Sequence, residues 1–415
     1  MAVQAEIISI GDEILYGQTL DTNSHWISGK LDEIGIKVRR KITIGDTREE
    51  ILTCLKESSE RADVVLITGG LGPTSDDLTK PLLAEYFGVG FTFHQDVLDH
   101  LVQLFSARGR EVTPVNRKQA DLPANCTKIA NKLGTAPGMW FDEDDTIYVS
   151  MPGVPYEMKS IMEESVLPML QERFTDGVIY HKIVKTVGIA ESNLSDMIKE
   201  WEEALPKNIK LAYLPTFGQV KLRLTSIGTD LDVLKQNVGE QIDKLLPLID
   251  AYVYGFDNDE LEAVIGDMLL KSGQTIAFAE SCTGGYISHL MTSVPGSSTY
   301  YMGSIVSYAY DVKVNSLDVN REQMETEGAV SENVVLQMAK SVREKLGADV
   351  GLSVSGIAGP GGGTEDKPVG TVWIGYSDKH KTIAKKFNFT KNRDLNIKFS
   401  ALNALNMFRL NFSGK

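Results

Sequence analysis

The C-terminal third of the chain carries a turn that combines two hydroxyl side chains with two glycines. Ser281 and Thr283 stand in the sequence Ser-Cys-Thr-Gly-Gly, which ends with Gly284 and Gly285. The apolar run before this turn is typical of a short buried strand, and the residues after it are typical of a helix. The turn is therefore expected at a helix N-terminus, where unpaired backbone N–H groups and the helix dipole attract an anion. An ordinary helix cap, with glycines that serve packing, is the alternative.

Further side chains that could bind or activate a substrate follow in strand ends and loops. They are Gly296 and Ser298 in a Pro-Gly-Ser-Ser turn, Tyr308 and Lys313 near a strand end, Ser355 and Gly356 before a glycine-rich loop, and Arg393 in a later turn. A lysine that loses its proton in an apolar pocket can deprotonate a serine, and a tyrosine can relay or hold that proton. The pattern predicts a lysine-activated serine nucleophile, either Ser281 or Ser298. The glycine-rich loops and Arg393 are expected to hold an anion, with phosphate as the first choice.

Four motifs in this region together resemble the C-terminal domain of the CinA family. They are AESCTGG at 279–285, GAVSE at 328–332, SGIAGP at 355–360 and KPVGTVW at 367–373. The resemblance runs from about Glu260 to the C-terminus. It implies a deamidase that acts on nicotinamide mononucleotide (NMN), with no cofactor at this site.

The N-terminal region alternates expected strands and helices in the order β-α-β-α-β. This order predicts a parallel sheet that binds ligands at the carboxyl ends of its strands. The third strand ends in a glycine-rich loop, and its candidate ligand groups are Gly69, Gly70, Gly72, Thr74, Asp76 and Asp77. A glycine-rich turn beside adjacent carboxylates suits a phosphate together with a divalent cation. A simple turn before an acidic helix cap is the alternative, but it does not explain three glycines at one strand end.

Two motifs of this region, TGGLGPTSDDLT at 68–79 and MPGVP at 151–155, resemble the MoaB/MogA molybdopterin-binding fold. Two others, NRKQA at 116–120 and NKLGTAPG at 131–138, are closer to the N-terminal domain of the CinA family. The match covers roughly residues 4–170. It implies an ADP-ribose pyrophosphatase that depends on a divalent metal ion (Mg²⁺, Mn²⁺ or Co²⁺), with potassium also involved. A role in molybdopterin chemistry is the alternative for this domain.

Position along the expected sheet selects further polar candidates for this second site. The metal-binding candidates are Asp12, Asp46, Asp76 and Asp77, and the nucleotide-binding candidates are Asn23, Asn116 and Gln119. The resemblance supports Asp77 best. Carboxylates can hold a metal that polarises a pyrophosphate oxygen and activates water.

Between these two regions, residues 180–254 show the order β-α-β-β-α-β, which predicts a small α+β module. In the family this module resembles a K-homology-like linker domain. No Gly-x-x-Gly clamp stands in its first helix turn, so nucleic acid is not an expected partner and a spacer or dimer role is favoured. The whole chain is expected to be an α/β protein with domains at 1–175, 176–256 and 257–415, assembled as a homodimer.

Composition limits the class of protein. With 415 residues, 42% hydrophobic and 24% charged, the chain is expected to form two or three globular domains. A net charge of −14 argues against general nucleic-acid binding, and three scattered cysteines argue against a disulfide framework or a zinc site. No signal peptide or membrane-spanning stretch is evident in the sequence, so a cytoplasmic location is expected.

Two classes of function remain open at this stage. The first is a bifunctional hydrolase of pyridine-nucleotide salvage, which converts NMN to nicotinate mononucleotide and ammonia and cleaves ADP-ribose to AMP and ribose 5-phosphate. The second is a non-catalytic nucleotide sensor or competence-linked protein. The presence of both Tyr308 and Lys313 favours the enzyme, because a sensor needs the glycine-rich loops but no proton acceptor.

Overall fold

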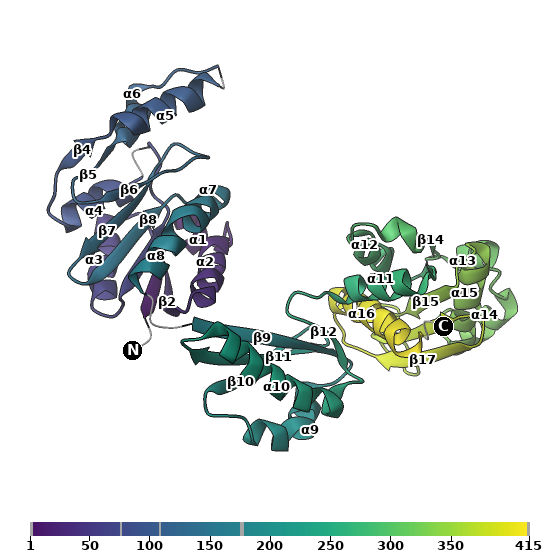
Figure 1. Ribbon diagram of the computed structural model, residues 1–415. Coiled ribbons are helices and arrows are strands. Elements are labelled where there is room, and N and C mark those ends of the chain that lie inside the picture. Colours follow the sequence, from purple (N-terminus) through teal and green to yellow (C-terminus); the bar gives the residue numbers. More distant parts are fainter. Residues whose placement is uncertain (1–2, 75–76, 108, 175–177, 413–415) are drawn as a thin grey trace. The chain divides into compact units, whose positions relative to one another are not determined.

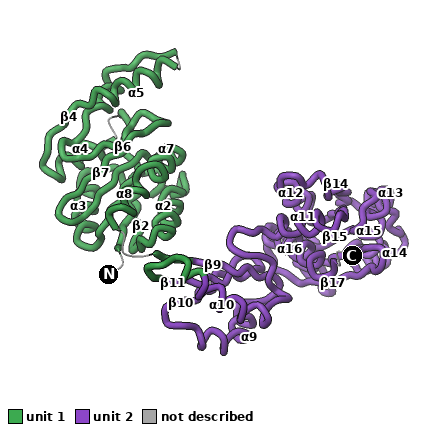
Figure 2. Tube along the Cα trace, in the orientation of Figure 1, with its two compact units in different colours: residues 1–180, 227–235 green, residues 181–226, 236–415 purple. Residues whose placement is uncertain are grey.

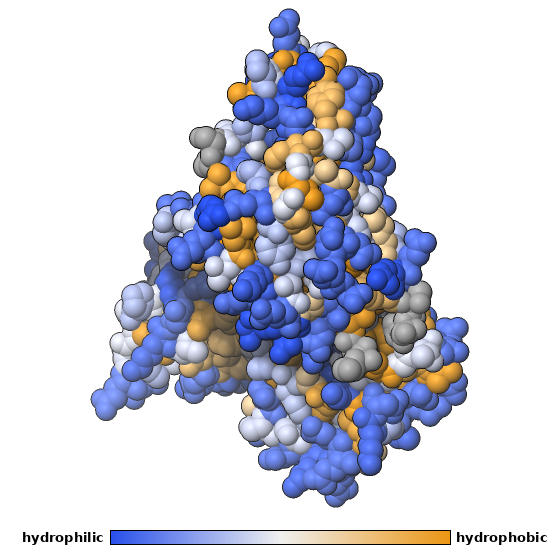
Figure 3. Space-filling view, turned by 90° about the vertical axis from the view of Figure 1, so that its left-hand side faces the viewer, coloured by the Kyte–Doolittle hydropathy of each residue, from blue (hydrophilic) through white to orange (hydrophobic). Residues whose placement is uncertain are grey.

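A computed structural model of the chain describes residues 3–74, 77–107, 109–174 and 178–412. Its internal contacts divide it into two compact units, residues 1–180 with 227–235 and residues 181–226 with 236–415 (Figure 2). No helix in the described ranges is long and apolar enough to cross a membrane. The face shown in Figure 3 is mainly hydrophilic, with hydrophobic residues in scattered groups.

The first unit is built on a six-stranded sheet of order β2-β1-β3-β8-β7-β6 (Figure 1). Its parallel strands are β1 (Gln4–Ile10), β2 (Lys37–Ile44), β3 (Val64–Thr68) and β8 (Thr146–Met151), and its antiparallel strands are β7 (Gly138–Glu143) and β6 (Thr127–Ile129). Successive residues of β1 face opposite sides, so Ala5 and Ile7 enter one core and Ile8 and Ile10 enter the other. The predicted parallel sheet is confirmed, with an antiparallel extension at one side.

Helices cover both faces of this sheet. One core packs under α2 (Thr22–Glu33), α7 (Pro155–Ile161) and α8 (Leu167–Arg173), and the other under α3 (Arg48–Ser59) and α4 (Thr79–Tyr86). A π turn (Met162–Val166) joins α7 to α8 at Pro168, whose missing N–H cannot continue the regular ladder. A small subdomain adds β4 (Phe91–Phe93), α5 (Gln95–Ser106), α6 (Pro114–Arg117) and β5 (Asp121–Pro123).

The middle of the chain forms a four-stranded sheet of order β10-β11-β9-β12. Its elements are β9 (Val178–Val187), α9 (Glu191–Glu203), β10 (Ile209–Thr216), β11 (Gln219–Gly228), α10 (Leu231–Ile249) and β12 (Val253–Phe256). The two helices are tied together where the Trp201 indole N–H donates to the Gln241 carbonyl at 3.0 Å. The predicted β-α-β-β-α-β order is confirmed.

The C-terminal part is a five-stranded sheet of order β14-β13-β15-β16-β17. The strands are β13 (Ile276–Glu280), β14 (Tyr301–Val306) and β15 (Val350–Gly356), which are parallel, and β16 (Thr371–Ser377) and β17 (Thr382–Asn388), which are antiparallel. Each of β2 and β17 is an outer strand at one side of its sheet, and both carry several lysine or arginine residues.

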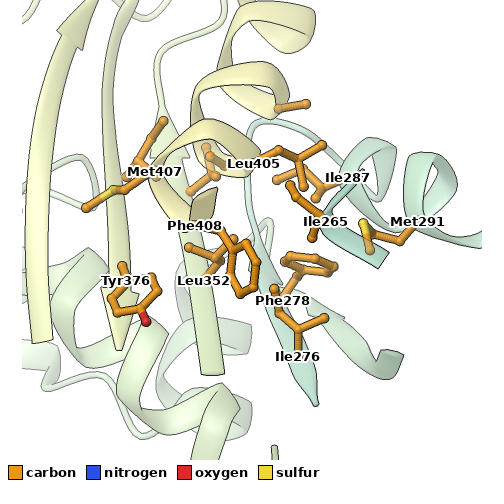
Figure 4. Close-up of a cluster of buried hydrophobic side chains, with 14 of the residues drawn as sticks. Ile265, Ile276, Phe278, Ile287, Met291, Leu352, Tyr376, Leu405, Met407 and Phe408 are labelled. Carbon is orange, nitrogen blue, oxygen red and sulfur yellow. The ribbon is translucent and has the colours of Figure 1, made fainter. Parts of the chain in front are cut away.

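Helices again cover both faces of this sheet. One face packs against α11 (Leu261–Ser272), α12 (Tyr286–Thr292) and α16 (Arg393–Asn411), and the other against α13 (Tyr310–Leu317), α14 (Arg321–Glu327) and α15 (Glu332–Lys345). Figure 4 shows the first of these cores, in which Phe278 and Leu352 of the sheet meet Phe408 of α16. The parallel strands β13, β14 and β15 therefore have their C-terminal ends at the same side of the sheet, and helices on both faces hold these strands in place.

Candidate functional sites

A serine and a lysine meet at this edge of the C-terminal sheet. Ser281 follows β13 directly, and Lys313 lies in the first turns of α13, the helix after β14. The lysine amine Nζ donates a hydrogen bond to the serine Oγ at 2.9 Å. Only 1% of Lys313 and 7% of Ser281 is exposed, so the pair is shielded from bulk water.

The environment of Lys313 favours its neutral form. Besides Ser281, its amine contacts the backbone carbonyl oxygens of Ser307 (2.5 Å) and Tyr308 (3.3 Å). It forms no ion pair with the carboxylates of the described residues. Burial lowers the pKa of Lys313 to about 8. Roughly one tenth of the amine is therefore unprotonated at pH 7 and able to accept a proton from the serine.

The dyad opens into a cavity of about 300 Å³. Its lining comes from the ends of β13 and β15, the start of α13, the 328–330 loop, the glycine-rich loop and the start of α16, and comprises Ser281, Cys282, Tyr308, Tyr310, Lys313, Gly328, Ala329, Val330, Ser355, Gly356, Ile357, Ala358, Gly362, Thr364, Lys367 and Arg393. The structure thus brings five of the predicted residues, Ser281, Lys313, Tyr308, Ser355 and Arg393, to one cavity, together with Gly356.

Tyr308 and Arg393 form the outer part of this cavity. Arg393 donates from Nη2 to the Tyr308 hydroxyl at 3.1 Å and from Nη1 to the Gly359 carbonyl at 2.7 Å. The tyrosine is 60% exposed, and only its backbone carbonyl contacts Lys313. In this geometry the tyrosine hydroxyl belongs with the arginine at the rim and is not hydrogen-bonded to the lysine amine as a proton relay would be.

The helix N-terminus after Ser281 differs from expectation, because the protein fills it with its own carboxylate. Glu280 is fully buried and accepts hydrogen bonds from the backbone N–H groups of Gly285 (3.0 Å), Ile287 (3.1 Å) and Ser288 (2.9 Å). A ligand anion would have to displace this carboxylate. The predicted anion site at this helix start is therefore wrong, and Gly284, Gly285 and Thr283 do not line the cavity. The hydroxyl of Thr283 is buried without a partner in the described part of the chain.

The second candidate serine lies elsewhere. Ser298 is exposed in a short 3₁₀ turn (Ser297–Thr299), and neither it nor Gly296 lines the cavity. Of the two candidate serines, the geometry therefore favours Ser281, which contacts Lys313 and lines the cavity. Cys282 is a packed thiol, and its burial raises its pKa to about 12.

Sequence reasoning missed Glu280 and Lys367. Lys367 donates to the backbone carbonyl oxygens of Glu327 and of Val330 (2.8 Å) and so fixes the 328–330 loop against the cavity. Both residues stand inside the quoted family motifs, but a motif gives no direction for a side chain.

A larger cavity, of about 510 Å³, lies at the strand ends of the first unit. It is lined by the glycine-rich loop after β3, the start of α2, the 152–155 turn and several acidic residues. The predicted residues in its lining are Asn23, Asp46, Gly69, Gly70, Gly72 and Asp77. A Cβ on Gly69 would lie 2.2 Å from the Ile10 carbonyl oxygen, so this glycine is required by packing as well as by any ligand.

Asp77 and Asp46 play different parts in this cavity. Asp77 braces the glycine-rich loop, accepting from Gly72 N–H at 2.8 Å and from Thr74 N–H at 2.9 Å. Burial and the neighbouring carboxylates of Asp12, Glu13 and Asp77 raise the pKa of Asp46. The cavity therefore has one end where negative charge is concentrated.

The other predicted residues of this domain have local contacts. Gln119 is buried and donates to the Leu71 carbonyl at 3.0 Å, so it supports the loop from behind. Asn116 forms a capping box with Thr113 at the start of α6 and does not line the cavity. Thr74 and Asp12 also lie outside the lining, and Asp76 falls outside the described residues.

The architecture and the two cavities define a three-part α/β protein, with a MoaB/MogA-like domain, a K-homology-like module and a C-terminal domain that holds a buried Ser–Lys pair. Comparison with known families agrees: residues 6–172 match a probable molybdopterin binding domain, residues 181–255 the damage-inducible protein CinA KH domain and residues 258–412 the CinA C-terminal domain. The chain belongs to the CinA family.

Individual relatives extend over the full length. A CinA-like protein of Cytophaga hutchinsonii is 51% identical over 407 residues, which are 98% of this chain and 97% of that protein. A putative competence-damage inducible protein of Halothermothrix orenii is 40% identical and covers 94% of each chain. Among solved structures, the CinA protein of unknown function from Thermoplasma acidophilum is 33% identical, with a TM-score of 0.37, and covers 41% of this chain and 97% of its own.

Proposed function

We propose that the C-terminal site deamidates NMN to nicotinate mononucleotide and ammonia. The buried hydrogen bond between Lys313 and Ser281 is the observation that carries this proposal. A nucleophile and a base within hydrogen-bond reach form the minimal apparatus for acyl transfer, and a neutral lysine can act as the base.

The steps follow from this pair. Ser281 Oγ attacks the carboxamide carbon while Lys313 Nζ takes the serine proton, and the lysine then returns a proton to the departing NH₂ group, which leaves as ammonia. Water, deprotonated by the same lysine, attacks the resulting serine ester and releases the carboxylate product. Arg393 at the rim and the glycine-rich loop would hold the phosphate of the nucleotide. No metal enters these steps.

Ammonia release from NMN by the pure protein tests the proposal. Ser281→Ala should abolish release, and mass spectrometry of a slow substrate should show the acyl group on the peptide that contains Ser281. If Ser298→Ala abolishes release and Ser281→Ala does not, the assigned dyad is wrong. If the wild-type protein releases no ammonia from NMN, the result favours the alternative, a non-catalytic nucleotide-binding protein.

We further propose that the cavity of the first unit hydrolyses ADP-ribose to AMP and ribose 5-phosphate. The glycine-rich loop beside an acidic end supports this second activity, and the volume of about 510 Å³ is in the range of small-molecule sites. No group of three Asp, Glu, His or Cys residues in the described ranges could hold a metal ion on its own. Mg²⁺-type sites, however, use one or two carboxylates together with waters and substrate phosphates.

The residues present fit such a cation. Carboxylate oxygens are hard donors, and a cation would relieve the repulsion that raises the pKa of Asp46. Asp46 and Asp77 would hold the metal, which when bound would offset the charge of the pyrophosphate and acidify a water. Formation of AMP and ribose 5-phosphate from ADP-ribose, measured with and without chelator, tests the proposal. Adenylyl transfer to a pterin in place of ADP-ribose hydrolysis would favour the molybdopterin alternative.

A further inference from the structure

Glu157, in the first turn of α7, is a buried carboxylate in the wall of the large cavity. It is 8% exposed, and its Oε2 accepts a hydrogen bond from Asn131 Nδ2 at 2.7 Å. Asn131 is itself fixed, since its Oδ1 accepts from the backbone N–H groups of Leu133 (3.1 Å) and Gly134 (2.9 Å). A Cβ at position 134 would lie only 2.0 Å from Glu157 Oε2. The loop therefore closes around the carboxylate and holds it in one place.

Two acceptor atoms in this wall receive no hydrogen bond from the described residues. The second carboxylate oxygen of Glu157 accepts no hydrogen bond from any described residue. Asn23 is 9% exposed, and its amide NH₂ donates to the Thr68 hydroxyl (3.1 Å) and the Gly153 carbonyl (2.7 Å). Its Oδ1 is buried and receives no hydrogen bond from the described residues. An unpaired buried acceptor such as Asn23 Oδ1 is costly, so this wall is suited to a ligand that donates hydrogen bonds.

These acceptors are distinct from the acidic end of the cavity. Asp46 accepts from the Asp12 N–H at 3.3 Å and Asp77 accepts from the Gly72 N–H at 2.8 Å, whereas Glu157 accepts from Asn131. A phosphate would be repelled by Glu157, whereas a neutral hydroxyl can donate to it.

We propose that Glu157 and Asn23 bind the ribose hydroxyls of the substrate, and so select a sugar-bearing nucleotide over a bare pyrophosphate. The assignment rests on the proposed ADP-ribose hydrolysis; it gives Asn23 a specific role there and adds Glu157 as a second specificity residue. With the phosphates at the acidic end, hydroxyls of the attached sugar would donate to these two acceptors of the same cavity.

Glu157→Gln is a sharp test because it preserves one contact and inverts the other. The glutamine oxygen still accepts a hydrogen bond from Asn131. The other carboxylate oxygen is replaced by an NH₂ group, which cannot accept a hydrogen bond from a hydroxyl. Calorimetry would measure the binding of ADP-ribose and of inorganic pyrophosphate, in metal-free buffer and again with Ca²⁺. Glu163→Gln, an exposed change in the adjoining π turn, is the matched control.

The expected result is a loss of at least about 10-fold in ADP-ribose affinity for Glu157→Gln, with unchanged pyrophosphate affinity and a control that behaves as wild type. Equal loss for both ligands, or none for ADP-ribose, would overturn the inference. A rise in the metal concentration needed for half-maximal activity would also overturn it, because Glu157 would then be a metal ligand. A wild-type protein that binds ADP-ribose without cleaving it refutes the proposed hydrolysis alone, and the calorimetric comparison still decides the role of Glu157.

Discussion

Replacing Lys313 by methionine should remove activity without removing stability. Methionine fills nearly the same volume with an apolar chain, so the cavity wall stays intact, but no group remains to take the proton of Ser281. Loss of a general base lowers turnover by about 100-fold or more. Ammonia release from NMN measures this loss directly, and near wild-type release would refute the dyad.

The pH dependence of the wild-type enzyme follows from the same residue. With a pKa of about 8 for Lys313, roughly one tenth of the amine is neutral at pH 7 and about nine tenths at pH 9. Since only the neutral amine accepts a proton, kcat/KM for NMN should rise with pH and level off above about 8. A profile that is flat between pH 6 and 9 would contradict the reasoning.

The lowered pKa of Lys313 also makes the stability of the fold depend on pH. The lysine pKa is lower in the folded chain than the ordinary value of 10.5, so the unfolded state binds more protons between about 8 and 10.5, and stability rises with pH there. Below pH 8 the burial of the lysine costs up to about 3 kcal/mol, which its three hydrogen bonds offset in part. Methionine removes this cost, so at pH 7 the variant should melt no lower than wild type.

A denaturation series against pH measures this difference. The gap between Lys313→Met and wild type should narrow as pH rises towards 10, whereas Lys340→Met, an exposed lysine of α15, should show no such trend. If Lys313→Met unfolds several degrees below wild type at pH 7, the lysine is held by favourable interactions and the proposed neutral state is wrong.

Other perturbations test the remaining contacts. Arg393→Ala should raise KM for NMN more than it lowers kcat, and nicotinamide riboside, which lacks the phosphate, should be a poor substrate for wild type; equal rates for the two substrates would rule out a phosphate clamp. Glu280→Ala should lower the free energy of unfolding, measured by urea titration, by about 3 kcal/mol, because three backbone N–H groups lose their acceptor. Glu280→Gln should lower it by less. An unchanged free energy of unfolding in both variants would refute the role of Glu280 as a helix cap. Chelator should abolish ADP-ribose hydrolysis and spare NMN deamidation, and Asp77→Asn should do the same; loss of both activities together would show that the two sites are not independent.

The sequence was sufficient for the sheets and for the prediction that a lysine activates a serine, either Ser281 or Ser298. Apolar runs followed by helical patterns predict parallel β-α units, whose strands end on the same side of the sheet. The choice between Ser281 and Ser298 was not available from sequence, since both follow strand or turn signals and only the direction of the Lys313 side chain separates them.

The helix start after Ser281 shows why local signals fail. Unpaired N–H groups at a helix N-terminus predict an acceptor, but they do not say whether a ligand or a neighbouring carboxylate provides it. Glu280, one residue before the serine, takes that place. Asn116 is a second example. The sequence made it a candidate for nucleotide binding, but its side chain takes part in the capping box at the start of α6.

The positive charge of β2 and β17 bears on whether this acidic chain aggregates while it folds. An outer strand offers unpaired N–H and C=O groups to any passing strand, and positive side chains there discourage pairing with another sheet. The chain has a net charge of −14, yet β2 carries Lys37, Arg39, Arg40 and Lys41, and β17 carries Lys385 and Lys386. These six cations lie on strands that could otherwise pair edge to edge with the same strand of a second copy, and repulsion between like charges opposes that pairing.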